Sequence, residues 1–170
     1  MASYPLPRWR PGRSSRQRAP LYTAEQRLRR DATRWTLVQA VLAPVQFLAF
    51  LLSLALVLRF LWTGQGLQAA VLSVLVKTSL LYLIMVTGCC WEKVVFGRWL
   101  FAPAFYWEDM LGMLVLGLHT AYLLAWWNGW GTPAQQLAIA LAAYASYALN
   151  AVQFVLKLRA ARRQAAGVAR

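Results

Sequence analysis

Three of the five acidic residues in this 170-residue chain lie in one stretch, from Trp91 to Asp109. They are Glu92, Glu108 and Asp109, and the same stretch holds two cations and seven aromatic rings. Long apolar segments flank it on both sides. Carboxylates are costly near lipid, so a cluster of them beside apolar segments is a candidate functional site. The alternative is an interfacial loop anchored by its aromatic and cationic side chains.

Motifs that would indicate other chemistry are not found in the chain. It has no dinucleotide fingerprint, no phosphate-binding loop, no paired histidines at metal-ligand spacing and no serine nucleophile elbow. The two cysteines, Cys89 and Cys90, are neighbours, which favours packing in a helix over a disulfide or a zinc site. An enzyme built on this sequence would therefore work by acid–base catalysis. A carboxyl group at the edge of an apolar region suits that role, because it can hold its proton near neutral pH.

Sixty per cent of the residues are hydrophobic and 14% are charged. Soluble domains average about 45–50% apolar and about 25% charged residues, so this is the composition of a membrane protein. The formal charge is +13, but nine of the eighteen cations precede Trp35 and five lie from Lys157 onward. Cations clustered beside apolar segments face anionic lipid. The sequence therefore predicts contact with a lipid bilayer and none with nucleic acid.

Four apolar segments are long enough to cross a bilayer, since about 20 helical residues span its ~30 Å core. The sequence predicts an all-α integral membrane protein, a bundle of four transmembrane helices within residues 35–158. The expected spans are 35–61, 67–91, 107–128 and 133–158. We expect a disordered basic tail over 1–20, an interfacial amphipathic segment over 21–34 and a basic C-terminal tail over 159–170.

The placement of positive charge predicts how these spans are oriented. Four spans put both termini on one side, and the short links at 62–66 and 129–132 hold no Lys or Arg. The loop that contains Lys93 and Arg98 falls on the side of the basic termini. Because cytoplasmic segments are enriched in Lys and Arg, we expect both termini and the acidic loop to face the cytoplasm.

Polar side chains inside the spans extend the candidate site. Lys77 and His119 each lie about ten residues, or roughly 15 Å, from the outer ends of their helices. Gln46, Asn150 and Gln153 fall in the inner half. Together with the acidic loop they indicate a polar cavity open to the cytoplasm, suited to a large, flat, mostly apolar ligand. The alternative is that the amides only join helices and that the histidine only packs.

Several runs of residues together resemble one family. They are Arg29–Thr33, Trp35–Gln39, Leu42–Phe47, Lys77–Gly88, Trp91–Asp109, His119–Tyr122 and Asn150–Arg162. The chain resembles the 3-vinyl bacteriochlorophyllide hydratases, called 2-vinyl in older ring numbering, over about Leu21 to Arg163. The block Trp-Glu-Lys-Val-Val-Phe-Gly-Arg is its most specific part. The resemblance implies a small membrane enzyme of bacteriochlorophyll synthesis, a hydro-lyase. It would add water to the C3 vinyl group of a chlorophyllide-type tetrapyrrole to give a 1-hydroxyethyl group, without a cofactor of its own.

The resemblance supplies no catalytic residues, so their roles are hypotheses from the chain itself. Hydration begins with protonation of the vinyl CH2, after which water attacks the resulting cation. We expect Glu108 to be the acid, with Glu92 or Asp109 positioning the water. His119 is either an axial ligand to the substrate magnesium or a packing residue. It lies about 16 Å from Glu108 along their helix, too far for direct proton exchange. The expected substrate contacts are His119, Lys77, Phe105, Tyr106, Trp107, Gln46, Asn150 and Gln153, with Lys93 or Arg98 on the propionate.

Two other functions remain open from the sequence. A pigment-binding or assembly subunit of a photosynthetic membrane complex would use the same aromatic residues and His119, but would not need the carboxyl cluster. A transporter built on Lys77, His119 and Glu92 is less favoured, because the two halves show no inverted repeat. The resemblance implies a bacterial inner membrane, cytoplasmic or intracytoplasmic. Homo-oligomers, or contacts with other pigment-synthesis or photosynthetic proteins, are further expected partners.

Overall fold

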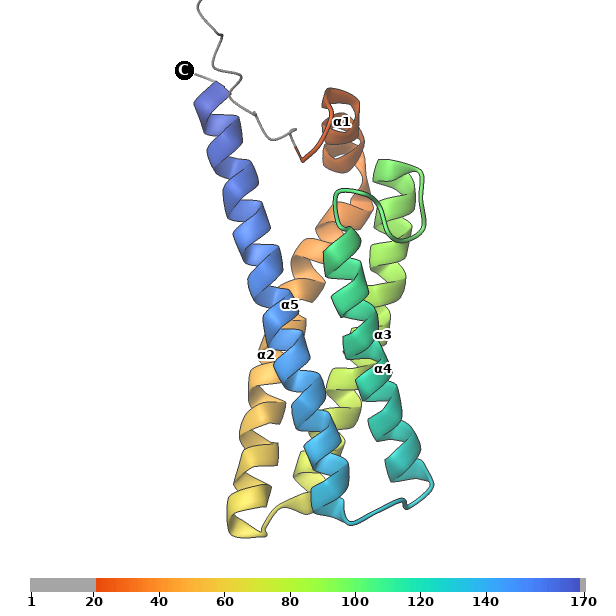
Figure 1. The fold of residues 1–170 in the computed structure, drawn as a ribbon, viewed down its shortest axis with the longest axis vertical. Coiled ribbons are helices and arrows are strands. Elements are labelled where there is room, and N and C mark those ends of the chain that lie inside the picture. The colour runs from red at the N-terminus through yellow and green to blue at the C-terminus, as the bar shows by residue number, and fades with distance from the viewer. Residues whose placement is uncertain (1–20, 169–170) are drawn as a thin grey trace, which may run out of the picture.

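The computed structural model describes residues 21–168, which form five helices and no strand. The helices are α1 (Ala24–Ala32), α2 (Arg34–Thr63), α3 (Leu67–Phe96), α4 (Tyr106–Trp127) and α5 (Pro133–Val168), arranged as a long bundle (Figure 1). The all-helical prediction is confirmed, and four of these helices are long and apolar. The expected basic tail over 1–20 lies outside the described residues.

Four helical segments are long and apolar enough to cross a membrane: α2, α3, α4 and residues Pro133–Ala160 of α5. Their outward faces are lined with exposed aliphatic side chains, as for Leu48, Leu52 and Leu72. Exposed tryptophans mark both ends of the bundle, with Trp62 and Trp127 at one end and Trp99, Trp107 in the α3–α4 region at the other. Belts of Trp at two levels are typical of a protein that meets both interfaces of a bilayer. The chain is a membrane protein.

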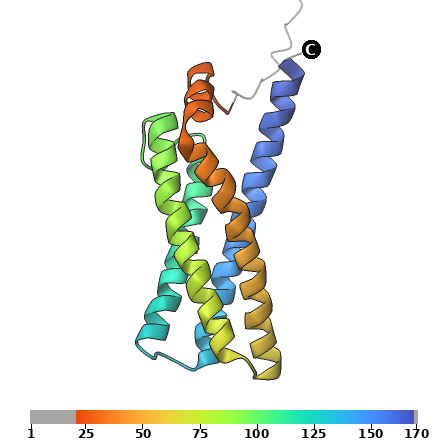
Figure 2. The ribbon, with the colours of Figure 1, turned by 180° about the vertical axis from the view of Figure 1, so that it is seen from behind.

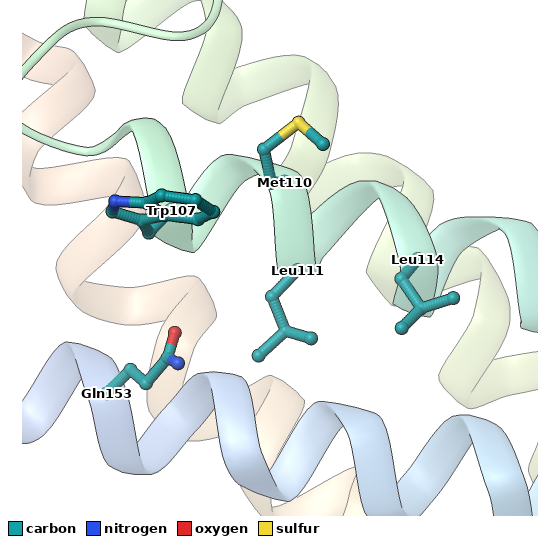
Figure 3. Close-up of a pocket in the computed structure, with 5 residues that line it drawn as sticks. All are labelled: Trp107, Met110, Leu111, Leu114 and Gln153. Atoms are coloured by element: carbon teal, nitrogen blue, oxygen red, sulfur yellow. The ribbon is translucent and has the colours of Figure 1, made fainter.

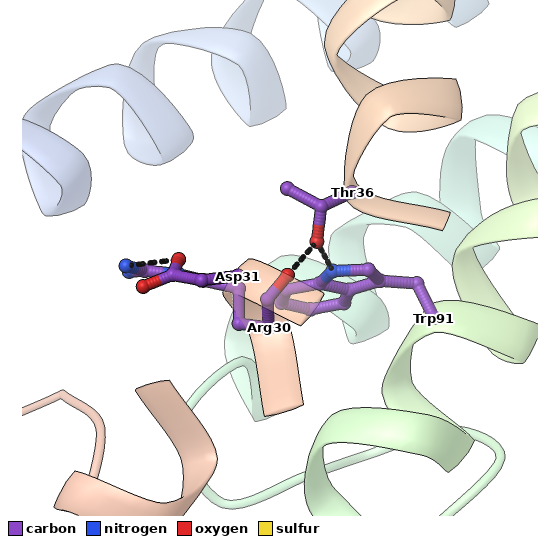
Figure 4. A network of polar contacts seen from close by, with 4 residues as sticks. All are labelled: Arg30, Asp31, Thr36 and Trp91. Carbon is purple, nitrogen blue, oxygen red and sulfur yellow. Dashed lines mark hydrogen bonds and ion pairs between the residues drawn. The ribbon is translucent and has the colours of Figure 1, made fainter. Parts of the chain in front are cut away.

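The short helix α1 is built by its own capping residues. The Thr23 hydroxyl accepts the Gln26 N–H, and the Gln26 side chain accepts the Thr23 N–H, which together form a capping box. Thr33 then ends α1 and caps α2. Next to this junction, Trp91 of α3 donates through Nε1 to the Thr36 hydroxyl at 2.9 Å, and that hydroxyl donates to the Arg30 carbonyl at 2.6 Å (Figure 4). The α1–α2 corner is therefore fixed against α3.

The chain runs as two hairpins, α2–α3 and α4–α5. Packing is extensive within each hairpin and sparser between them. The α2–α3 and α4–α5 turns lie at one end of the bundle, while α1, the α3–α4 link and the end of α5 lie at the other (Figures 1 and 2). Gly64 and Gly66 make the first turn possible with φ of +68° and +84°, a region that favours glycine. The α3–α4 link is thus the segment of the chain that leads from one hairpin to the other.

The apolar part of α5, Pro133–Ala160, agrees with the expected span over 133–158. The helix itself continues to Val168, because Ala- and Arg-rich sequence supports a helix beyond the apolar span. Helix α2 passes Pro44 without a break. Pro44 is exposed, so the carbonyl that loses its backbone hydrogen bond there lies on an outer face.

Aromatic side chains from both hairpins meet in the middle of the bundle. The Phe50 ring lies 5.5 Å from that of Tyr144 and 5.0 Å from that of Tyr147. Ser53 joins the two hairpins through its hydroxyl, 2.6 Å from the Tyr144 hydroxyl and 2.8 Å from that of Ser73. These rings take up part of the space in which the polar cavity is expected.

The Ser53–Tyr144 hydrogen bond predicts a measurable contribution to stability. Tyr144→Phe keeps the ring packing but removes a buried hydroxyl bond, so the free energy of unfolding should fall by about 1 kcal/mol. Thermal unfolding in detergent measures this. Ser79→Ala is the matched control, because the Ser79 hydroxyl is exposed and bonds only the Leu75 carbonyl of its own helix. Equal stability of Tyr144→Phe and wild type would show that the bond is not a hairpin tie.

A candidate acid–base site at the α3–α4 link

The candidate site lies where α3 ends and α4 begins. Gly97, with φ of +77°, terminates α3, and the link continues to Phe105. Glu92 stands on the last turns of α3 and is buried, whereas Asp109 stands on the first turn of α4 and is half-buried. An acidic side chain in the first turn of a helix also meets its unpaired N–H groups favourably. The sequence places 16 residues between these two carboxyl groups, and the link returns them to each other.

Glu92 and Asp109 each hold one peptide of the link. Glu92 Oε2 accepts the N–H of Ala102 at 3.1 Å, and Asp109 Oδ2 accepts the N–H of Phe101 at 2.9 Å. Because Phe101 and Ala102 are adjacent, these two bonds bring the carboxyl groups close to each other. Two like charges this close in a partly buried site disfavour ionisation of both groups. The arrangement therefore favours one proton on the pair.

The backbone at Phe101 shows how firmly the link is held. Phe101 is the one described non-glycine residue with a positive φ, +58°. A left-handed conformation costs a residue with a Cβ about 1–2 kcal/mol. The N–H that this conformation presents is the one bound by Asp109. The charge-assisted bond offsets the strain, and it fixes the position of the carboxyl pair.

Glu108 is in a different situation from the other two carboxyl groups. Its Oε2 lies 2.5 Å from Lys157 Nζ of α5, in an ion pair in which the Glu108 side chain is 7% exposed. The same ammonium lies 4.9 Å from the centre of the Phe105 ring. The Lys157 ammonium thus occupies one oxygen of this carboxyl group. The acid role expected for Glu108 stays a prediction, which Glu108→Gln tests.

An aromatic cluster packs against the end of the link at Phe105. Phe105 is 2% exposed, and its ring stacks on that of Phe154 at 5.5 Å and meets that of Trp91 at 5.7 Å. Tyr22 covers the cluster, and burial raises the pKa of its phenol above the ordinary value, so the group stays neutral at physiological pH. Phe105 therefore packs inside the protein and is not free to stack on a ligand.

Tyr106 and Trp107 are exposed, and Trp107 lines an open groove of about 410 Å3 between α4 and α5. Met110, Leu111 and Leu114 of α4 form one wall, and Gln153 of α5 faces them (Figure 3). Trp107 and Asp109 are two positions apart on a helix, so they face different sides of α4. The groove therefore does not open directly onto the carboxyl pair.

The two cations of the link, Lys93 and Arg98, are both exposed. Lys93 Nζ donates to the Gly97 carbonyl at 3.2 Å and lies 5.7 Å from the centre of the Trp99 ring. Neither cation is paired with a carboxylate within residues 21–168. Both are available to an anionic group at the surface of the link.

Of the polar residues expected deeper in the bundle, Gln46, Lys77 and His119 are buried, Asn150 is half-buried and Gln153 is exposed. The first four each have an atom without a hydrogen-bond partner among the described residues. These atoms are Nε2 and Oε1 of Gln46, Nζ of Lys77, Nε2 of His119 and Oδ1 of Asn150. Lys77 Nζ lies 4.1 Å from the centre of the Tyr147 ring. The Asn150 amide lies against Gly112, where an added Cβ would be 3.7 Å from Nδ2. The structure thus places these residues inside the bundle, apart from the carboxyl pair.

Some members of the site were not recognised from the sequence. The spacing of Lys157 from Asn150 and Gln153 places the three residues on one face of the last helix. That spacing does not indicate that Lys157 pairs with Glu108. The N–H donors of Phe101 and Ala102 leave no signal in the sequence, because every residue except proline has such a group. The role of Tyr22 in covering the link also depends on tertiary packing.

Comparison with known proteins identifies relatives along most of the chain. The family model of the 2-vinyl bacteriochlorophyllide hydratases matches residues 22–160. A protein of that name from Rhodobacter capsulatus is 64% identical over 149 residues, 88% of this chain and 86% of the relative. One from Cereibacter sphaeroides is 63% identical over 142 residues, 84% of this chain and 88% of the relative. No solved structure matches the chain.

The Glu108–Lys157 ion pair predicts a non-additive pair of substitutions. Lys157→Met leaves the Glu108 carboxylate buried without a partner, and should lower the free energy of unfolding by roughly 1–3 kcal/mol. The double variant Glu108→Gln, Lys157→Met should recover much of this loss, because no unpaired charge remains. Chemical unfolding of the three proteins measures the coupling. Strictly additive losses would mean that the two groups do not interact in the membrane protein.

Proposed function

The chain belongs to the 2-vinyl bacteriochlorophyllide hydratase family, and on that premise we propose that Glu92 and Asp109 are its acid–base pair. It is a membrane-embedded hydro-lyase of bacteriochlorophyll biosynthesis, with a vinyl-bearing tetrapyrrole as substrate. The observation that carries the proposal is that the two carboxyl groups, one from each hairpin, accept hydrogen bonds from adjacent peptides of the link, which brings them close enough to share a proton.

The reaction uses this proton directly. The protonated carboxyl gives its proton to the terminal CH2 of the vinyl group, and the cation formed at the neighbouring carbon is stabilised by conjugation with the macrocycle. Water attacks that carbon and loses a proton to the carboxylate that the first step left behind. One C–H and one C–O bond have then formed, the π bond of the vinyl group and one O–H bond of water have broken, and the pair holds one proton again. No electron is transferred, so we propose that the enzyme needs no cofactor; the magnesium belongs to the substrate.

The surroundings of the carboxyl groups support this division of roles. Glu108 forms an ion pair with Lys157. Its proposed role is to leave no unpaired charge at this end of the bundle. The Phe101 and Ala102 N–H groups stabilise whichever carboxylate is formed when the proton leaves. They also fix the two side chains, so that the acid is oriented before the substrate arrives.

The exposed cations of the link are suited to bind the propionate of the substrate. Lys93 and Arg98 lie in the polar interfacial region, where a carboxylate attached to an apolar macrocycle would also lie. An Arg guanidinium can bind a carboxylate through two parallel hydrogen bonds. The macrocycle would then reach the carboxyl pair from the membrane while its acid group stays at the surface.

Charge placement supports a cytoplasmic orientation of this end of the bundle. The α3–α4 link, α1 and the end of α5 carry most of the described cations, whereas the opposite turns at 64–66 and 128–132 carry none. Because Lys and Arg are enriched on the cytoplasmic side, the link and both ends of the chain would face the cytoplasm. The proposed location is the inner membrane of a photosynthetic bacterium.

The alternative function, a subunit that binds pigment without chemistry, is not favoured. Both relatives are named as hydratases, and they match this chain over most of its length. A binding protein would also have no use for a carboxyl pair that retains a proton next to the membrane.

Removal of either carboxyl of the pair should stop the reaction. Glu92→Gln and Asp109→Asn keep the hydrogen-bonding shape but remove the acid or the base, so turnover should fall by about 100-fold or more. The measurement is hydration of a 3-vinyl chlorophyllide in isolated membranes, followed by the blue shift of the long-wavelength band as conjugation is lost.

Two comparisons make this measurement decisive. Glu25→Gln removes an exposed carboxyl on α1 that pairs only with Arg29, and should leave turnover unchanged. Glu108→Gln should retain more activity than either variant of the pair. Wild-type turnover in both Glu92→Gln and Asp109→Asn, or loss of activity in Glu108→Gln alone with folding intact, would contradict the assignment.

The orientation predicts which sites an impermeant thiol reagent can reach. In a Cys89→Ala, Cys90→Ala background, Arg98→Cys should be labelled in inverted membrane vesicles and protected in right-side-out cells. Gln65→Cys, in the α2–α3 turn, should show the opposite pattern. The reverse result would place the link on the outer side of the membrane.

A further inference from the structure

His119 lies in the middle of α4 and is completely buried. Its Nδ1 lies 2.8 Å from the carbonyl oxygen of Val115. A carbonyl oxygen only accepts, so Nδ1 carries the hydrogen and donates it. Nε2 has no hydrogen-bond partner among the described residues. The imidazole is thus held in one orientation and one tautomer, with the lone pair of Nε2 directed into the protein.

Other buried polar atoms of this part of the bundle also have no hydrogen-bond partner among the described residues. They include Lys77 Nζ of α3 and the hydroxyl of Tyr122, three residues beyond His119 on α4. The Tyr144 ring of α5 connects the group, because its centre lies 5.7 Å from both the His119 ring and Lys77 Nζ. Each buried polar group without a partner costs about 1–3 kcal/mol. Such a cluster in a membrane interior indicates that something else, either a ligand or water, satisfies it.

The hydrogen bond of Nδ1 and the free Nε2 give His119 the arrangement of a metal-binding histidine. Metal-ligating histidines characteristically donate the other ring N–H to a backbone carbonyl or a carboxylate, which fixes the ring and strengthens the ligand nitrogen. The metal of a magnesium tetrapyrrole has its four equatorial positions filled by the macrocycle and an axial position free. We propose that His119 Nε2 is the axial ligand of the substrate magnesium. The identity of the pigment in this inference rests on the proposed function.

Such a ligand would have to enter between the two hairpins. His119 lies near the boundary between α2–α3 and α4–α5, where packing is sparser than within each hairpin. Two hydrogen bonds cross this boundary near His119, one between Ser53 and Tyr144 and one of 2.6 Å between the hydroxyl groups of Tyr82 and Thr120. A macrocycle admitted between the hairpins would be held near its centre by Nε2. His119 and Asp109 are separated by about 15 Å along α4, so one edge of this wide ligand would extend toward the carboxyl pair.

The experiment compares binding of two pigments to the purified protein in detergent: a magnesium 3-vinyl chlorophyllide and its magnesium-free counterpart. The wild-type protein should prefer the magnesium form and give a resonance Raman spectrum with a nitrogen axial ligand. His119→Leu should reduce this preference by about tenfold or more and lose the ligand signature. His119→Gly with added imidazole should restore both, because free imidazole can occupy the vacated position.

A catalytic variant separates this inference from the acid–base proposal. Glu92→Gln should bind the magnesium pigment with the wild-type ligand spectrum although its turnover is low. If Glu92→Gln turns over normally, the acid–base proposal fails, while the His119 measurements stand. If His119→Leu keeps the magnesium preference and the ligand spectrum, the inference is overturned, and Nε2 is satisfied by internal water. Imidazole that fails to restore ligation in a folded His119→Gly protein would overturn it as well.

Discussion

The need to pair every charge at the membrane surface of the bundle determines how the α3–α4 link is built. Three carboxyl groups lie here within a few turns of one another, in a chain that has only five. One is paired with a lysine from α5, and the other two bind adjacent peptides of the link. The side chains in these contacts come from three helices, α3, α4 and α5, and they gather around the link that joins the hairpins. The strained backbone at Phe101 is tolerated because a carboxylate accepts its N–H. The same bonds therefore stabilise the fold and orient the groups that could perform chemistry.

In the interior between the hairpins, by contrast, not every polar group is paired. The polar groups there come from all four long helices, and several have no hydrogen-bond partner among the described residues. Aromatic rings separate them: Tyr144 packs beside His119, and Tyr147 packs over the Lys77 ammonium. A cation over an aromatic face is partly compensated for the loss of water. The interface is consequently less tightly bound than either hairpin, and is the part of the bundle best suited to open for a flat apolar ligand.

Much of this structure could be predicted from the sequence. The parts that could not depend on contacts between residues far apart in the sequence. Apolar length predicts the four long helices, and Thr23 with Gln26 predicts the start of α1, because both depend on local sequence. Seven-residue spacing places Gln39, Gln46 and Ser53 on one face, and the structure confirms it: Gln39 bonds Thr87 of α3, and Ser53 bonds Ser73. The partner of Glu108 could not be predicted, since Lys157 is 49 residues away. The size of the expected polar cavity could not be predicted either, because the sequence does not show how far tyrosine rings fill an interface.

The location of Glu92 on one hairpin and Asp109 on the other has a kinetic meaning. On the proposed mechanism, neither residue by itself would retain the shared proton, and the acid would be assembled when the two hairpins are in register. A pigment that passed between the hairpins would separate them to some extent, and this would also separate the pair. The acid would then become competent only as the hairpins return around a correctly placed macrocycle. Turnover would be coupled to closure of the bundle, and lipids or substitutions that change this closure would alter the rate without contact with the reacting atoms.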